Sequence, residues 1–318
     1  EALLPQLGDG LVRPFARRAF LAAGDDALHF LDQSLAPSFQ LSTDVGSSLA
    51  GMPRAALKAG ALIPRRVRRH IPRTLSRFPA EQVAPMLLRH MQTEEDGAVR
   101  YKMLRGLGRI RAQHPKLEID TRAVKTLFRA TLERVVHLLE FQMAVRTQHR
   151  DHPSLGAELI EASLEEKVAN ALERSFRFLG LLNPREDFAL LWRGVRSKDA
   201  HAHAAAMELL EHVLTGAERA ALLALLDRRP TAQRLAYAAQ ALSITFPPQT
   251  YPARLGAALH DRSEALRSLV AYHVAELGLT DLEPQLRDAK PDREGFVSEV
   301  MERALQALLG NREVTGAA

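Results

Sequence analysis

Apolar residues recur every three or four positions along most of this chain, which is the spacing of one buried face of an α-helix. No stretch alternates apolar and polar residues between hairpin turns, so the pattern predicts an all-α fold. Gly97 and Gly278 stand where helices are expected to break or stop. The spacing is clearest in three sets: Val67, Ile71, Leu75 and Phe78 behind Pro64; Val99, Met103, Leu107 and Ile110; and Leu266, Val270, His273 and Leu277.

These helices also look repetitive along the chain. Each set places an apolar residue and an arginine or histidine early in a helix, and Val67 lies 32 residues before Val99. Ala202 lies 64 residues before Leu266, twice that interval. A period of this size with two helices per unit is typical of an α-solenoid, in which stacked repeats share one core.

The middle of the chain interrupts this repeat. Residues 120–148 and 154–182 each read as one long helix, and the turn-forming pair His152-Pro153 lies between them. We expect an inserted antiparallel helical hairpin over residues 120–183. Residues 36–60 are rich in Ser, Thr, Gly and Pro and predict a long connection. The predicted organisation is an N-terminal helical segment and linker over 1–53, followed by a HEAT-like α-solenoid over 54–318.

The repeats carry a family resemblance. Asp96-Gly97-Ala98-Val99-Arg100, and Asp261 followed by Leu266-Arg267, resemble the Asp…Val-Arg motif of HEAT repeats. In that family the aspartate and the arginine link successive repeats. The runs over 63–107 and 165–196 are similar to the HEAT-repeat extensions that follow the membrane part of bacterial transporter-like proteins related to nucleotide translocases. The resemblance implies an interaction or regulatory domain of a larger protein, and a transport function is not expected of this chain.

Composition narrows the possible chemistry. The 318 residues contain no cysteine, which excludes disulfide scaffolds, cysteine nucleophiles and cysteine-ligated metals. No apolar run approaches the roughly 18 residues of a membrane-spanning helix, and no signal peptide is recognisable. We therefore expect a cytoplasmic location. The chain begins with Glu1 rather than Met, which fits a segment of a larger protein.

Charge is distributed unevenly. Residues 54–129 hold 18 Lys and Arg against 6 Asp and Glu, a net charge of +12, although the whole chain carries only +5. Residues three or four apart share one face of a helix. The basic residues from Arg65 to Arg77 therefore predict one stripe, and those from Lys102 to Arg109 predict a shorter stripe on a second helix, each opposite the apolar residues of its helix. If the two helices stack, the stripes form one basic surface for an acidic or phosphate-bearing partner. An ordinary solvated face with intramolecular ion pairs is the competing interpretation. The candidate partner-binding residues are Arg65, Arg69, Arg73, Arg77, Lys102, Arg105 and Arg109.

No catalytic or metal site is expected. His201, His203 and His212 do not share a helix face, and His273 falls on an apolar face, as a hydrogen-bonded core residue would. No histidine is followed by glutamate, so the iron-binding His-Glu pairs of deoxyhypusine hydroxylase-type HEAT enzymes are absent. No phosphate-binding glycine loop or nucleophile elbow occurs, and no cofactor is expected.

The leading prediction is a non-catalytic HEAT-repeat scaffold with a basic surface. The alternative is a DNA-binding, HEAT-like alkylpurine glycosylase, in which Trp192 with Asp187 or Asp199 would act on a base. Trp192 also continues the apolar series around it, and few aromatic residues lie among the basic ones, which favours the scaffold over nucleic-acid binding.

Overall fold

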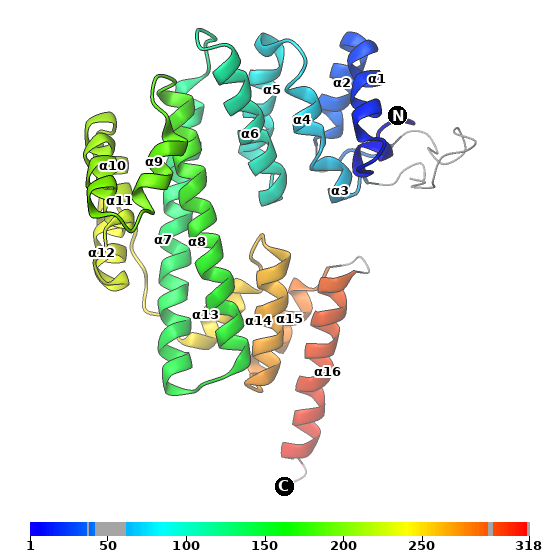
Figure 1. Ribbon diagram of the computed structural model, residues 1–318. Helices are drawn as coiled ribbons and strands as arrows, with labels where there is room; N and C mark the ends of the chain where they lie inside the picture. The colour runs from blue at the N-terminus through cyan, green and yellow to red at the C-terminus, as the bar shows by residue number, and fades with distance from the viewer. Residues whose placement is uncertain (37, 42–61, 292–294, 317–318) are drawn as a thin grey trace. The chain divides into compact units, whose positions relative to one another are not determined.

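A computed structural model describes residues 1–36, 38–41, 62–291 and 295–316 of the chain (Figure 1). The predicted all-α class is confirmed: these residues form helices, and the described ranges contain no strand beyond an isolated antiparallel bridge between Gln40 and Leu62. No helix in the described ranges has an apolar stretch long enough to cross a bilayer. The helices are η1 Pro5–Gly8, α1 Arg13–Ala22, α2 Gly24–Ser34, α3 Arg65–Arg68, α4 Ile71–Leu75, α5 Ala80–Thr93, α6 Gly97–Gln113, α7 Thr121–Asp151, α8 Leu155–Leu182, α9 Phe188–Val195, α10 Ala200–Val213, α11 Gly216–Leu226, α12 Thr231–Leu242, α13 Tyr251–Ala258, α14 Glu264–Glu276, η2 Thr280–Leu282, α15 Glu283–Ala289 and α16 Phe296–Gly316.

The chain divides into two compact units. The first unit comprises residues 1–128 and 176–190, and the second comprises 129–175 and 191–318. The long helices α7 and α8 match the two long helices predicted on either side of His152-Pro153, and each contributes residues to both units. Most of the predicted connection over 36–60 lies outside the described residues, and so does the proposed boundary at residue 53.

The first unit is built on the apolar faces that the sequence predicted. Val67, Ile71 and Leu75 are buried, and so are Val99 and the apolar residues that follow it on α6. Helix α6 contacts both α4 and α5, so these faces meet in one core. Because the apolar residues turn inward, most charged positions between them are left at the surface of the unit, while Arg68 is buried.

The predicted single helix behind Pro64 is wrong. The segment forms two short helices, α3 and α4, with a break at Arg69 and His70. Pro72 explains the break, because in an uninterrupted helix its ring would clash with the carbonyl of Arg68 and its nitrogen could donate no hydrogen bond. Pro72 is tolerated in the first turn of α4 instead. The four arginines spaced from Arg65 to Arg77 therefore do not form one continuous stripe.

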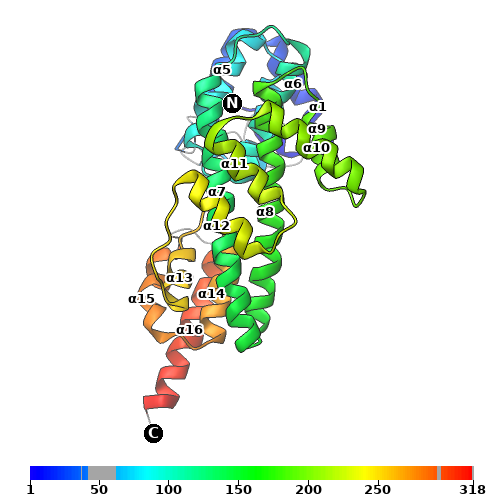
Figure 2. The same cartoon turned by 90° about the vertical axis from the view of Figure 1, so that its left-hand side faces the viewer.

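The second unit has its own core. Helix α11 packs on α12, and α14 packs on α13 and α16 (Figures 1 and 2). Leu266 and Val270 of α14 are buried as predicted, and His273 is buried with them. Gly278 ends this segment with a φ of 64°, a left-handed conformation that glycine adopts without strain, which confirms the predicted helix stop. Near the turn between the long helices, Arg146 of α7 pairs with Glu161 of α8 at 2.5 Å.

Candidate functional site

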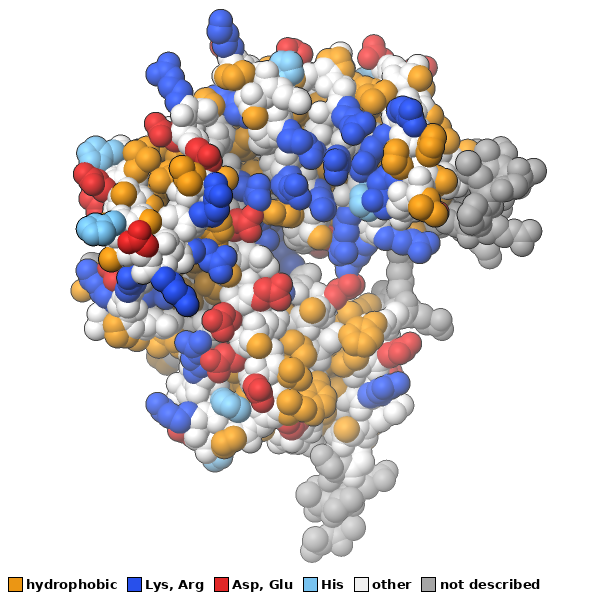
Figure 3. All heavy atoms as spheres, in the orientation of Figure 1, with side chains coloured by type: hydrophobic (Ala, Val, Ile, Leu, Met, Phe, Trp, Pro, Cys, Tyr) orange, Lys and Arg blue, Asp and Glu red, His pale blue; other side chains and the backbone are white. Residues whose placement is uncertain are grey.

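Eight basic side chains of the first unit gather on one surface, which we call the basic face. They come from α1, from α4 and the residues beside it, and from α6. Figure 3 shows Lys and Arg side chains crowded where these helices lie. Five of the eight are predicted residues and three are not. The members are Arg13, Arg17, His70, Arg73, Arg77, Lys102, Arg105 and Arg109.

Helix α1 supplies the inner part of the basic face. The side chain of Arg13 is fixed by two backbone carbonyls, because its Nε donates to Leu7 O at 2.7 Å and its Nη2 donates to Gly8 O at 3.3 Å. Arg17 is only 7% exposed, and its Nε donates to the hydroxyl of Thr74 at 3.3 Å. A buried guanidinium is held here by a neutral hydroxyl rather than by a carboxylate.

Helix α6 supplies one flank of the face. Arg109 donates from Nη2 to the hydroxyl of Ser76 at 2.9 Å, which ties α6 to the end of α4. The guanidinium of Arg105 lies over the ring of Tyr101, 5.9 Å from its centroid. Arg177 approaches the same ring at 5.1 Å and donates to the tyrosine hydroxyl at 3.1 Å. Tyr101 is therefore already engaged by two guanidinium groups.

The basic face holds positive charge that the carboxylates of the described residues do not pair with. Within the described ranges, none of its eight members forms an ion pair with a carboxylate, although other cations of this unit do so. Burial and, after it, the nearby charges of Arg73 and Arg77 together lower the pKa of Arg17 to about 10. Burial, followed by neighbouring arginines, also lowers the pKa of Lys102 and of Arg109. Each cation thus disfavours the charged form of its neighbours, and a bound anion would favour that form.

His70 lies within this positive field. Burial lowers its pKa from the usual 6.5 to about 4, and the charges of Arg13, Arg17 and Lys102 act in the same direction. The imidazole is consequently neutral at pH 7. It offers one hydrogen-bond donor and one acceptor among groups that only donate.

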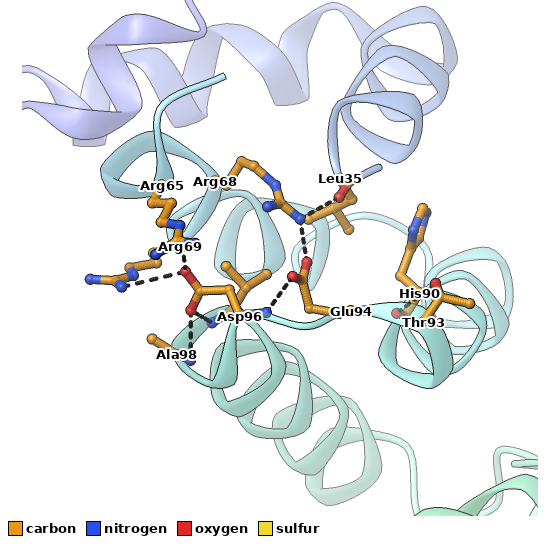
Figure 4. A network of polar contacts seen from close by, with 10 residues as sticks. Leu35, Arg65, Arg68, Arg69, His90, Thr93, Glu94, Asp96 and Ala98 are labelled. Atoms are coloured by element: carbon orange, nitrogen blue, oxygen red, sulfur yellow. Dashed lines mark hydrogen bonds and ion pairs between the residues drawn. The ribbon is translucent and has the colours of Figure 1, made fainter. Parts of the chain in front are cut away.

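The structure separates the predicted site residues into two groups. Arg73, Arg77, Lys102, Arg105 and Arg109 lie together on the basic face. Arg65 and Arg69 instead face Asp96, with nitrogen–oxygen distances of 3.8 Å and 3.4 Å (Figure 4).

Asp96 and Glu94 organise that second network. Asp96 caps α6, since its Oδ1 accepts from the backbone nitrogens of Ala98 at 2.8 Å and Val99 at 3.2 Å. Glu94 accepts from the backbone nitrogen of Asp96 at 2.8 Å and forms a buried ion pair with Arg68. Arg68 in turn donates to Leu35 O at 2.9 Å (Figure 4). This network joins α2, α3 and α6, and each of its three arginines faces a carboxylate.

Sequence reasoning missed Arg13, Arg17 and His70. Arg13 and Arg17 precede the basic block by about 40 residues, and a tertiary contact, the hydrogen bond from Arg17 to Thr74, brings α1 to it. The sequence did contain one indication that Arg17 is buried. Arg17 is next to Ala16 and three positions before Phe20, which places it on the buried side of α1.

The other residues singled out in the sequence have structural partners. His203 shares a hydrogen bond with Val195 O at 2.8 Å, and His212 with Glu208 O at 2.8 Å. His273 lies between the hydroxyl of Tyr251 and the carboxylate of Glu276, 2.9 Å from each, as expected of a hydrogen-bonded core histidine. No three His, Asp or Glu side chains in the described part of the chain are grouped to hold a metal ion.

The residues named for the glycosylase alternative also make contacts with residues close to them in the sequence. Asp187 and Asp199 accept hydrogen bonds from the first turns of α9 and α10. Trp192 is half-buried, and the guanidinium of Arg196 lies 5.4 Å from the centroid of its ring.

Comparison with protein-family models, with curated proteins and with solved structures finds no match for this chain.

Proposed function

We propose that this chain is a non-catalytic binding module whose basic face takes an acidic or phosphate-bearing partner. In this proposal it is a HEAT-like α-solenoid, with α7 and α8 as an inserted hairpin, and serves as an interaction or regulatory domain of a larger cytoplasmic protein. The observation that supports this function is the cluster of eight basic side chains, none of which pairs with a carboxylate of the residues that the structure describes. Folding brings these charges together at a cost in free energy, and an anionic partner offsets that cost.

Two aspartate–arginine contacts support the HEAT-like part of the proposal. Asp96 of the predicted motif faces Arg65 and Arg69 from the preceding helical segment. Asp261 of the second motif pairs with Arg134 of α7. Polar links between aspartates at helix starts and arginines of another helix are what the resemblance implies.

The chemistry of the basic face supports binding rather than catalysis. Seven of its members are Arg or Lys, residue types that attract anions and do not act as proton carriers near neutral pH. The ordinary pKa of a histidine lies near neutrality, but the lowered pKa of His70, about 4, keeps its imidazole neutral at pH 7, and no carboxylate in the described ranges forms a hydrogen bond with it. The face is thus suited to hold an anion in place.

A charge-reversal experiment tests this function. The double substitution Arg73→Glu and Arg105→Glu changes two exposed members of the face. The matched control, Arg122→Glu and Lys125→Glu, changes two exposed cations of α7 in the same unit. Neither control residue is among the charges that lower the pKa of Arg17, His70, Lys102 or Arg109.

Both variants lose the same charge, so only position distinguishes them. On a phosphocellulose column we expect the face variant to elute at clearly lower salt than the wild-type chain, and the control to elute close to it. Circular dichroism melts verify that both variants fold. Equal elution of the two variants would show that net charge alone accounts for retention and would refute the proposed face.

A further inference from the structure

The ligand of the basic face can be specified further if the proposed function holds. Arg73 is the common centre of the site, because its charge contributes to the lowered pKa of Arg17, His70, Lys102 and Arg109. Arg13 and Arg17 come from α1 and the other three neighbouring cations, Lys102, Arg105 and Arg109, from α6. Cations from three separate helices therefore converge on one place, which suits a compact ligand better than a long one.

Arg17 is a buried member of this site whose side chain is held in place. Its Nε is held by Thr74 at 3.3 Å, and the side chain is 7% exposed. Its two outer nitrogens have no hydrogen-bond partner in the described part of the chain, and neither is sealed from solvent. A guanidinium fixed at Nε presents its remaining nitrogens as a planar pair of donors, which matches the oxygens of a phosphate group.

The charge density of the face disfavours an acidic peptide. An extended peptide presents side chains on one side only at every second residue, roughly 7 Å apart, and each acidic side chain supplies one charge. A phosphate group carries up to about two charges and three acceptor oxygens. The seven Arg and Lys side chains of the basic face, Arg73 among them, are matched more closely by phosphates joined to one another.

The surroundings of Tyr101 disfavour a nucleic acid. Proteins that hold single strands stack bases on accessible aromatic rings. Tyr101 is the aromatic residue beside Lys102, and Arg105 and Arg177 both contact its ring, at 5.9 Å and 5.1 Å from the centroid. Phe78, which follows Arg77, is buried. Neither of these two aromatic residues is thus a free stacking platform beside the cations of α4 and α6.

We infer that the basic face is a binding site for a soluble oligophosphate, an anion of three or more linked phosphate groups, centred on Arg73 with Arg17 beneath it.

Titration calorimetry of the full chain at pH 7 and constant ionic strength tests this inference. The probes are inorganic tripolyphosphate, orthophosphate, a hexaglutamate peptide and a six-residue oligothymidylate. We expect tripolyphosphate to bind at least tenfold more tightly than each of the others. We also expect Arg73→Gln and Arg17→Met each to weaken tripolyphosphate binding by tenfold or more, while Lys125→Gln leaves it within twofold of the wild type.

The outcomes separate this inference from the function on which it rests. If hexaglutamate or oligothymidylate binds as tightly as tripolyphosphate and needs Arg73, the oligophosphate inference is overturned and the basic face remains a site for another anion. If orthophosphate binds as tightly as tripolyphosphate, the site takes a single phosphate and the inference is again overturned. If no probe binds, both the inference and the proposed function fail.

Discussion

The Nε atom of Arg17 lies 3.3 Å from the hydroxyl oxygen of Thr74 and donates a hydrogen bond that joins α1 to α4. The contact places a permanently charged group in a position only 7% exposed, beside other cations. A residue chosen for packing alone would be apolar here. The strain of this arrangement is measurable in the free protein.

Replacing Arg17 with Met should therefore stabilise the free protein. The pKa of Arg17 is lowered to about 10 by burial and then by Arg73, so at every pH below that value the group is charged and its charge costs more free energy in the folded state than in the unfolded chain. At pH 7 the substitution removes this penalty and loses one hydrogen bond. We expect the free energy of unfolding in urea to rise by roughly 1–3 kcal/mol. Arg18→Met, on the exposed side of the same helix, should change it by about 0.5 kcal/mol or less. A clear loss of stability in Arg17→Met would contradict this account of the face.

Asp96 should contribute more to stability than an aspartate that only caps a helix. Asp96 accepts from two backbone nitrogens of α6 and also faces Arg65 and Arg69. Asp187 accepts from two backbone nitrogens of α9, and no ion pair is found for it in the described ranges. Asp187→Ala should cost about 1 kcal/mol, the usual value for a lost cap. Asp96→Ala should cost roughly 2–3 kcal/mol, because its half-exposed ion pairs add a modest amount. Equal losses in urea denaturation would mean that the two arginines contribute nothing.

The buried pair of Arg68 and Glu94 predicts a non-additive double mutant. Glu94 is 3% exposed and Arg68 is 7% exposed, so removing one partner leaves the other charge buried. Arg68→Met should cost about 3–5 kcal/mol. Adding Glu94→Gln should recover at least about 1 kcal/mol, since the neutral amide needs no counter-charge and can still accept from the backbone nitrogen of Asp96. If the double variant is less stable than Arg68→Met, the pairing is not the main role of Glu94.

Local spacing predicted the parts of the basic face that share one helix. Arg105 and Arg109 lie four residues apart on α6 and were found from that spacing alone. The same reasoning wrongly continued a helix through Pro72, although a proline at that position is a recognisable helix start. Arg17 could not be placed, because its approach to Thr74 depends on tertiary packing between segments 57 residues apart. Periodicity determines which face of a helix is polar, but it does not determine which polar faces meet.

Gly156 should not tolerate a side chain. A Cβ atom at this position would lie 2.5 Å from Glu276 Oε2 and 2.8 Å from His273 Cβ. The same glutamate oxygen accepts from the backbone nitrogen of Gly156 at 2.9 Å, so the start of α8 cannot move away without losing that bond. We expect Gly156→Ala to lower the free energy of unfolding by about 1–3 kcal/mol. The control is Gly310→Ala in α16, where a Cβ meets nothing within 4 Å and the change should be neutral or stabilising by up to about 1 kcal/mol. Similar effects at the two glycines would contradict the close approach.

His70 should make the folded state sensitive to mild acid. The groups that face it are Arg13 and Arg17 of α1, Arg73 of α4 and Lys102 of α6, all cationic, and with burial they lower its pKa from 6.5 to about 4. Between these two values the unfolded chain binds a proton that the folded chain does not, so stability falls as the pH drops through this window.

The test compares His70→Gln with His114→Gln, an exposed histidine of the same unit. His70→Gln should reduce the loss of unfolding free energy between pH 7 and pH 4.5 by roughly 1–2 kcal/mol, because glutamine takes up no proton in either state. Carboxylates that titrate in this range act equally in both variants and cancel from the comparison. Urea denaturation at both pH values measures the difference. If the two variants lose the same stability on acidification, His70 is not held neutral by the cations around it.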